Sequence, residues 1–488
     1  MLPFQNLILP DRDKIFPIYK QITNRLISLI QEGTIQPGTY FPGTRQMAHL
    51  LNVNRKTVIN AYEELLSQEW IEAVPRKGYR VIPELPVIKP RSFQPRNHFI
   101  PTVPRDLKYT SLVSPAVEAR KITSKDIVVN DGFPDVRLAP FKEISEVYRD
   151  PVSSKKIKML IALRDDGGLE LLREATSIFL NETRGLNISK SDIIITRGAQ
   201  MAIYIAAMVL LKPGDNVVVS DPNYLFATEI MTNAGANIIT IPVDQDGINV
   251  DQLEKVLEKQ PIKLLYIVPH HHHPTTVTMS ANRRLRLLQL IDEHNLFLME
   301  DDYDYDFHYK NSPILPLASA SHNGKIIYIG SFTKLIAPSV RLGYLIAAPE
   351  ILKKAIHLKR LIDLRGDTFM EYMLAQMIIK GDLSRHINKS NKLYAQRCDL
   401  ICDLLTRKLS HAVEFTKPQG GMSVWLRFRD KYQINKVLAD AARNGLLLIG
   451  TTFQKKGDVN DNGLRFGFAS LSEEDMECAV NILSKITK

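Results

Sequence analysis

One lysine stands where a strand-like apolar run ends, among groups that bind phosphate. The stretch IIYIGSFTKLIAPSVRLGYL, residues 326–345, contains Lys334. Ser331 and Thr333 come just before this lysine, and Arg341 follows seven residues later. Hydroxyls and a guanidinium bind phosphate oxygens, and a partly desolvated lysine amine can form a Schiff base with a carbonyl compound. The alternative is a solvated lysine at a strand end, which is the common case for an isolated lysine.

A dense run of carboxylates follows a second apolar stretch. The sequence MEDDYDYDFHY, from Met299 to Tyr309, begins where the strand-like LFLM ends. Carboxylates at this density usually form a solvated face or a metal site, yet here an apolar strand leads straight into them. In a doubly wound sheet, ligands collect at the carboxyl ends of the strands. An Asp at this position can therefore serve a ligand at the sheet edge.

Two groups of residues raise the possibility of a metal site, and neither fits one well. The histidines in VPHHHHPTT, residues 268–276, point alternately to opposite faces if the chain is extended, and no matching Cys/His group lies nearby in the sequence. Cys398, Cys402 and Cys478 are too few for a disulfide framework or a zinc module, and we expect them to be core thiols. We predict no metal.

Length and charge set further limits. The 488 residues exceed one ordinary core, so we expect at least two domains. No apolar span reaches membrane length, and the first residues lack the order of a signal peptide, which predicts a cytoplasmic protein without a membrane partner. Of the net charge of +10, residues 1–82 carry +3 and residues 83–125 carry +5. A basic front favours a polyanionic partner.

Residues 1–82 have the pattern of a winged helix-turn-helix. Apolar residues recur at helical spacing up to Gly33, a short helix and a longer one flank a break at residues 52–54, and two strand-like runs surround a basic turn. This order predicts binding to double-stranded DNA. The candidate contacts lie at two helix starts and at the wing tip: Arg45, Arg55, Lys56, Thr57, Lys77 and Gly78.

The rest of the chain divides into three parts. Prolines interrupt every candidate element in residues 83–125, which predicts a proline-rich basic linker. Residues 126–346 alternate apolar strands with amphipathic helices, the rhythm of an α/β fold with a parallel sheet covered on both faces. Residues 347–488 are expected to form a smaller α+β lobe.

The stretch SFTKLIAPSVRLGYL resembles the lysine signature of fold-type I pyridoxal-phosphate enzymes, in the form carried by the MocR (GabR-like) branch of the GntR regulators. The resemblance covers nearly the whole chain. It implies a winged helix-turn-helix joined to an aminotransferase-like body with a mixed, mostly parallel sheet. It also implies pyridoxal 5'-phosphate as the cofactor, held by Lys334 as an internal aldimine, and a homodimer.

The resemblance assigns further residues to this site. TRGAQ resembles the family's TSGAQ turn, where Gly198, Ala199 and Gln200 meet the cofactor's phosphate at a helix N-terminus. The aromatic of SDPNY, Tyr224, stacks on the pyridine ring, and Asp301 keeps the ring nitrogen protonated.

Three more assignments follow from the same resemblance. Tyr303 lies near the phenolic oxygen of the cofactor. His273 lies beside the cofactor, because VPHHHHPTT resembles the family's PSHQYPTG, although Thr276 replaces a glycine. Arg465 in GLRFGFA resembles the arginine that holds the α-carboxylate of amino-acid substrates.

The sequence therefore predicts a pyridoxal-phosphate-dependent transcriptional regulator. Its signal would be an amine, an amino acid or the cofactor itself. One alternative is a working aminotransferase with an accessory DNA-binding head, because no residue of the site forbids a first half-transamination. Another is a plain GntR regulator whose effector domain has no cofactor and leaves Lys334 unmodified.

Overall fold

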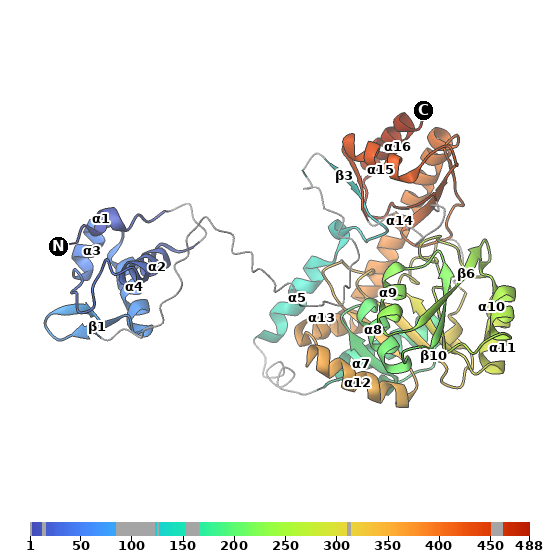
Figure 1. Ribbon diagram of the computed structural model, residues 1–488, viewed down its shortest axis with the longest axis horizontal. Helices are drawn as coiled ribbons and strands as arrows, with labels where there is room; N and C mark the ends of the chain where they lie inside the picture. The colour runs from blue at the N-terminus through green and yellow to red at the C-terminus, as the bar shows by residue number, and fades with distance from the viewer. Residues whose placement is uncertain are drawn as a thin grey trace. The chain divides into compact units, whose positions relative to one another are not determined.

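The computed structural model describes residues 2–11, 16–83, 123, 126–152, 165–309, 314–449 and 462–488. The chain divides into two compact units, Met1–Val117 and Glu118–Lys488. Both are seen in Figure 1. The division falls inside the expected linker, most of which lies outside the described residues. No helix within the described ranges has the length and apolar character needed to cross a membrane.

The first unit, the head, is a winged helix-turn-helix, as predicted. Its helices are α1 (Phe4–Leu7), α2 (Ile18–Gln31), α3 (Thr44–Leu50) and α4 (Arg55–Ser67), and the antiparallel wing is β1 (Ile71–Val74) with β2 (Gly78–Val81). The core of the head is built from apolar residues at helical spacing, among them Ile22, Leu26, Val58, Tyr62 and Leu65. Because α2 and α4 pack on this core, the starts of α3 and α4 are left to solvent.

The second unit, the body, is built on an eight-stranded sheet. The order is β4-β11-β10-β9-β8-β5-β6-β7, and β11 and β7 pair antiparallel with their neighbours while the other pairings are parallel. The bounds are β4 (Ile193–Thr196), β5 (Asn216–Asp221), β6 (Asn237–Asp244), β7 (Gly247–Ile248), β8 (Leu264–Ile267), β9 (Phe297–Asp302), β10 (Ile326–Ser331) and β11 (Gly343–Ile346). This is the mixed, mostly parallel sheet that the sequence predicts.

Helices cover the sheet on both faces, as the continuous apolar strands require. The helices are α5 (Phe141–Val152), α7 (Glu170–Arg184), α8 (Ala199–Leu210), α9 (Leu225–Asn233), α10 (Val250–Leu257), α11 (Ala281–Glu293), α12 (Pro349–Asp363) and α13 (Thr368–Ile379). One apolar core lies under α8, α9 and α12, and a second under α10 and α11. Helix α12 packs on α8, and α13 packs on α7. Both therefore belong to the layers around the large sheet, although they follow β11, its last strand in the sequence.

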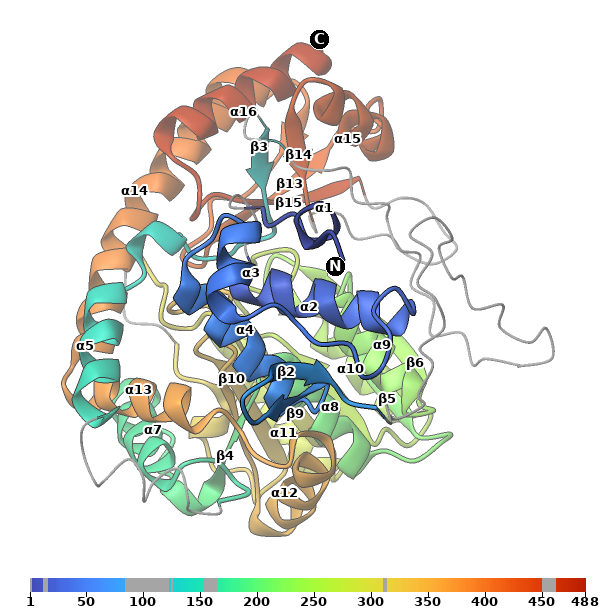
Figure 2. The same ribbon diagram turned by 90° about the vertical axis from the view of Figure 1, so that its left-hand side faces the viewer.

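A smaller lobe continues from the long helix α14 (Asp382–Leu409), which Figure 2 shows extending from α13 to α16 (Glu473–Ile486). Its antiparallel sheet is β12 (Val413–Glu414), β13 (Ser423–Phe428) and β15 (Gly463–Gly467). A two-stranded parallel sheet pairs β14 (Leu446–Leu448), after α15 (Ile434–Arg443), with β3 (Ile127–Val129). The chain that leaves the linker therefore enters the small lobe before it enters the large sheet.

The cysteines fit the expectation of core thiols only in part. Cys398 and Cys402 are buried on α14, where their spacing of four residues places both on the inward face. Cys478 is exposed on α16, so the expectation was wrong for this residue. Its apolar neighbours Met476, Ala479 and Val480 take the inward positions of that helix.

A buried ion pair lies on one side of the large sheet. Arg184 Nη2 lies 2.6 Å from Asp306 Oδ2, and the two side chains are 2% and 8% exposed. Arg184 Nε also donates to the hydroxyl of Tyr328, which in turn donates to Asp302 Oδ2. Every member of this network has a partner, as a low-dielectric interior requires.

Removing one partner of the buried pair should be costly. Asp306→Ala leaves the Arg184 guanidinium unpaired, and we expect the body to lose about 3–5 kcal/mol of stability. Urea unfolding, followed through Trp425 in a Trp70→Phe background, measures this loss. The matched control is Arg407→Ala, which breaks the exposed pair with Asp403 and should cost less than about 1 kcal/mol. Equal losses in the two variants would contradict the assignment.

Candidate functional site

Parallel strands bring the chemistry-bearing residues to one edge of the sheet. In the register of β9 with β10, Asp301 lies opposite Ile329 and Asp302 opposite Gly330. Lys334 follows the end of β10 by three residues. The turns after β4, β5 and β8 reach the same edge, because parallel strands all end there. Lys334 and Asp301 therefore belong to one site.

The Lys334 amine is enclosed by protein groups. Its Nζ donates to the carbonyl oxygen of Gly132 at 2.8 Å and lies 3.9 Å from the ring centre of Phe133. The Tyr303 ring centre is 5.8 Å away. Burial lowers the pKa of Lys334 below its usual range, although Asp131 acts in the opposite direction. A lowered pKa increases the neutral, nucleophilic fraction of the amine, as covalent carbonyl chemistry requires.

Asp301 has a carboxylate oxygen that faces no protein partner. Its Oδ2 accepts a 2.8 Å hydrogen bond from the Tyr266 hydroxyl on β8, while its buried Oδ1 has no hydrogen-bond partner in the described part of the chain. Burial raises the pKa of Asp301 to about 7. A buried acceptor without a donor is costly, and a protonated ring nitrogen would supply the missing donor. This atom fits the pyridine nitrogen of the cofactor.

An anion-binding corner lies at the start of α8. Gly198 precedes this helix with φ +81°, and a Cβ there would lie 2.9 Å from Arg341 Nη2. A glycine thus lets the helix N-terminus and the Arg341 guanidinium lie close together, and both favour phosphate. Ala199 and Gln200 are the first two residues of the helix, so their N–H groups have no intrahelical acceptor.

The two hydroxyls before Lys334 have different partners. Ser331 is buried, and its Oγ accepts from the backbone N–H of Thr333 at 3.2 Å. The Thr333 hydroxyl donates to the carbonyl of Val340 at 2.7 Å, which closes the loop that carries Lys334. Thr333 is therefore better placed to hold the loop than to donate to a phosphate.

Aromatic rings line the site around Lys334. The ring centres of Tyr224 and His273 are 5.1 Å apart at a near-perpendicular angle. The Tyr303 hydroxyl donates to the carbonyl of His271 at 3.0 Å and accepts from Arg465 at 2.9 Å. The structure thus brings Tyr224, His273 and Tyr303 to the site, but the single proton of the Tyr303 hydroxyl is already shared with a protein acceptor.

Each of the four consecutive histidines takes a different partner. The hydrogen-bond partners are Asp302 for His270, Asp304 for His271, Ser220 and Thr275 for His272, and Asp131 for His273. Burial lowers the pKa of His272 to about 3 and of His273 to about 4, so both are neutral near pH 7. Within the described residues, no group of three or more His, Cys, Asp or Glu side chains could hold a metal ion.

Arg465 lies on β15 and reaches the same site from the small lobe. It is 1% exposed, and it donates to the carbonyl of Asp131 at 2.7 Å, to the carbonyl of Pro274 at 2.9 Å and to the Tyr303 hydroxyl. A guanidinium has five N–H donors, so two remain beyond these three bonds. Any carboxylate held by Arg465 must share it with these oxygens.

The segment Asn130–Phe133 is a part of the site that the sequence analysis missed. Asn130 Oδ1 accepts from the N–H groups of Gly132 and Phe133 at 2.9 and 2.8 Å, which folds the segment into a tight turn. Gly132 has φ +112°, and a Cβ there would lie 2.2 Å from Ser423 Oγ. The letters NDG signal a turn, but nothing in them indicates which lysine the turn covers.

The predicted DNA contacts of the head lie on its surface. Arg45, Arg55 and Lys56 are exposed at the starts of α3 and α4, and Thr57 is half-buried. Asn54 caps α4 by accepting from the N–H of Lys56 at 2.8 Å. Lys77 and Gly78 are exposed at the turn between β1 and β2. All six residues are accessible to a ligand of the head.

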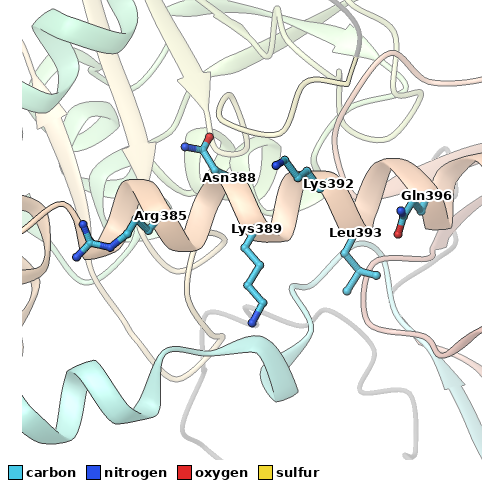
Figure 3. A pocket seen from close by; sticks show the side chains of 6 residues that line it. All are labelled: Arg385, Asn388, Lys389, Lys392, Leu393 and Gln396. Carbon is cyan, nitrogen blue, oxygen red and sulfur yellow. The ribbon is translucent and has the colours of Figure 1, made fainter.

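A hollow of about 460 Å³ lies elsewhere on the body, along α14. Figure 3 shows its lining side chains on this helix, with Lys389 extending away from it. The lining residues are Arg385, Asn388, Lys389, Lys392, Leu393 and Gln396. None of them belongs to the site around Lys334, so the hollow is not part of the candidate cofactor site.

Both units of the chain match known protein families. Residues 158–483 match the family "Aminotransferase class I and II", and residues 18–81 match "Bacterial regulatory proteins, gntR family". The chain is 30% identical over 372 residues to aromatic-amino-acid aminotransferase 1 of Thermococcus litoralis. The aligned stretch covers 75% of this chain and 89% of that protein.

Two further relatives cover different shares of the chain. The probable rhizopine catabolism regulatory protein MocR of Rhizobium meliloti is 25% identical over 98% of this chain and 95% of its own. The crystal structure of Pyrococcus horikoshii kynurenine aminotransferase, in complex with PMP, superposes on the body with a TM-score of 0.69. It is 30% identical and covers 75% of this chain and 91% of its own.

The chain belongs to the class I and II aminotransferase family, and it carries a gntR-type DNA-binding head. With this pair of domains, it is a transcriptional regulator of the MocR type. Its cofactor is pyridoxal 5'-phosphate. The unpartnered Asp301 Oδ1 and the anion-binding corner at Gly198 and Arg341 are the features of this chain that fit that group.

The raised pKa of Asp301 has a consequence for stability. Without cofactor, the folded state keeps a proton on this carboxyl between about pH 4 and pH 7, where the unfolded chain has lost it. Stability should therefore fall as pH rises through this window. Asp301→Asn has no such proton, so its stability relative to wild type should rise by about 3 kcal/mol between pH 4.5 and pH 8.

Urea unfolding of cofactor-free protein at the two pH values measures the change. The control is Asp399→Asn, which alters an exposed carboxylate on α14. A difference between Asp301→Asn and wild type that stays constant with pH would show that the carboxyl of Asp301 is ionised throughout.

Proposed function

We propose that this regulator controls DNA binding through a ligand that reaches Lys334. The cofactor is attached covalently to Lys334 Nζ, and an amine, an amino acid or the cofactor itself is the signal. The proposal is carried by two groups of one site. The Lys334 amine is buried and its pKa is lowered, and the buried Asp301 Oδ1 has no hydrogen-bond donor among the described residues. A fold that kept these groups only for packing would leave both at a free-energy cost.

The side chains of the site have separate parts in this proposal. The α8 N-terminus, Arg341 and Ser331 bind the phosphate, Asp301 holds the proton on the ring nitrogen, and Tyr224, His273 and Tyr303 fix the ring plane. When bound, pyridoxal 5'-phosphate supplies a carbonyl carbon for amines and a ring that accepts electrons. Gly132 O accepts a hydrogen bond from Lys334 Nζ, which limits how far the amine can move.

The second candidate function is a working aminotransferase with an accessory head. Arg465 favours it, because this buried guanidinium lies where an α-carboxylate could bind. Arg465 already donates hydrogen bonds to three protein oxygens, and this favours a regulator over a working enzyme. Sustained turnover with amino acids and keto acids, measured at steady state, would support the enzyme instead.

We also propose that two bodies form a homodimer. Large apolar side chains are exposed at the end of α12, where Leu361 is 72% and Leu364 is 67% exposed. Nearby in the sequence, Phe369 at the start of α13 is 40% exposed. Large apolar side chains left exposed are candidates for burial in an interface.

Charging this apolar surface should weaken the dimer. Leu361→Asp places a carboxylate in the proposed interface, so we expect the mass from light scattering to fall to that of one chain at micromolar concentration. The control is Leu285→Asp, since Leu285 is also exposed, at 63%, but on α11. A dimer that persists in Leu361→Asp, or a wild-type chain that is monomeric, would contradict the proposal.

The regulatory proposal separates ligand response from DNA contact. Lys334→Ala should fold and bind operator DNA like wild type, because it leaves Arg55 and Lys56 unchanged. It should lose any change in operator affinity on addition of pyridoxal 5'-phosphate and amine, a change commonly of about 5- to 150-fold. Arg55→Ala should show the reverse, with weaker, less salt-dependent DNA binding and an intact cofactor spectrum.

Operator titrations followed by fluorescence anisotropy, at several salt concentrations, compare the three proteins. Borohydride reduction followed by mass spectrometry independently tests whether the cofactor is attached at Lys334. If Lys334→Ala responds to the ligands as fully as wild type, covalent attachment is not the switch.

A further inference from the structure

We propose that Asp131 makes the ligand site prefer amines that carry a second positive charge and disfavour α-amino acids. This inference rests on the proposed function, because it names the chemical class of ligand that reaches Lys334. Asp131 lies in the turn Asn130–Phe133 and supplies a carboxylate to the site that the sequence analysis did not find. Its role would be to determine specificity.

The backbone of Asp131 is fixed from two sides. Its carbonyl oxygen accepts from Arg465 Nε at 2.7 Å and from the Ser423 hydroxyl at 2.8 Å. The next residue, Gly132, accepts from Lys334 Nζ. These three bonds hold the turn against the small lobe and the lysine loop, and none of them uses the carboxylate of Asp131. The carboxylate is not needed to hold the turn, and its own hydrogen bond is with His273.

The carboxylate of Asp131 lies close enough to Lys334 to raise the pKa of the lysine. Its Oδ2 lies 3.4 Å from His273 Nε2, and the side chain is 20% exposed, which makes it more accessible than Asp301. Despite partial burial, His273, Lys334 and Arg465 hold the pKa of Asp131 below its usual range, so it is ionised at neutral pH. A ligand that reaches Lys334 meets this negative charge.

The groups around Asp131 do not fully neutralise the negative charge that a ligand meets there. His273 is neutral near pH 7 because burial lowers its pKa to about 4. Arg465 donates to three uncharged oxygens, and its bond to Asp131 goes to the backbone carbonyl. Burial lowers the pKa of Lys334, so its amine offsets the carboxylate less than an exposed lysine would. The charge of Asp131 is then available to an ammonium group of the ligand.

The charges on a ligand then decide its affinity. An α-carboxylate that approaches Arg465 must compete with the three protein oxygens that this guanidinium already binds. It is also repelled by the Asp131 carboxylate, and this repulsion is strong because the site is partly desolvated. A second ammonium at the same place meets an accessible carboxylate and gains a charge-assisted hydrogen bond. Diamines and related polycationic amines are therefore the ligand class that fits.

Three ligands of matched chain length test the inference. They are n-butylamine, 1,4-diaminobutane and L-2-aminobutyrate, which differ in a second cation or an α-carboxylate. Each is titrated into full-length protein saturated with pyridoxal 5'-phosphate, and the change in the cofactor's absorbance gives an apparent Kd. In wild type we expect 1,4-diaminobutane to bind about tenfold more tightly than n-butylamine, and L-2-aminobutyrate to bind most weakly.

Asp131→Asn removes the charge but keeps the shape and the backbone carbonyl. It should bind 1,4-diaminobutane and n-butylamine about equally and bind L-2-aminobutyrate more tightly than wild type does. Asp131→Glu keeps the charge and should retain the wild-type order of the three ligands. Asp399→Asn, far from the site in sequence and on the exposed face of α14, should match wild type.

Two results would overturn the inference. One is a wild-type protein that prefers L-2-aminobutyrate, and the other is an Asp131→Asn variant that keeps the diamine advantage. The proposed function fails in a different way. The predicted order of ligands without any change in operator affinity would support the role of Asp131 and contradict regulation of DNA binding through this site.

Discussion

The parallel register of β9 with β10 is the constraint on which the site depends. It sets Asp302 opposite Gly330, so that both strands end at one edge and the loop after β10 brings Lys334 close to Asp301. A shift of one residue would turn Asp301 to the other face of the sheet, because side chains alternate along a strand. The site therefore follows from the same apolar strand packing that makes the fold.

Two neighbouring carboxylates on β9 are both buried but differ in their partners. Asp302 is buried, yet His270 and Arg184, together with the Tyr328 hydroxyl, hold its pKa below the usual range. Asp301, on the opposite face, has only the Tyr266 hydroxyl, and burial raises its pKa. The face with complete partners stabilises the protein. The face with a missing partner is where an external cation can bind, at a cost in stability when it is absent.

The sequence predicted the head, the sheet and the motifs at its edge, because each depends on local periodicity and on turns at strand ends. The place of Lys334, Asp301 and Gly198 at strand ends could be predicted in this way, since the carboxyl ends of parallel strands converge, while their roles toward the cofactor stay predictions that follow from the family resemblance. Asp131 and Gly132 could not, because Gly132 accepts from Lys334 and Asp131 raises the pKa of that lysine from about two hundred positions away in the sequence. The partners of the four histidines were also beyond reach, because tertiary packing and not local pattern decides them.

The turn Asn130–Phe133 also connects the Lys334 site to the small lobe. Gly467 N donates to Asn130 O, and Arg465 donates to Asp131 O, so the turn is attached to β15 of the small lobe. The turn follows β3, which pairs with β14, and β3 follows in sequence the linker that leads to the head. A ligand that replaces Gly132 at Lys334 Nζ must shift this attachment or leave a carbonyl without its donor. Such a difference in contacts between two states is what the proposed regulation requires of a bound ligand.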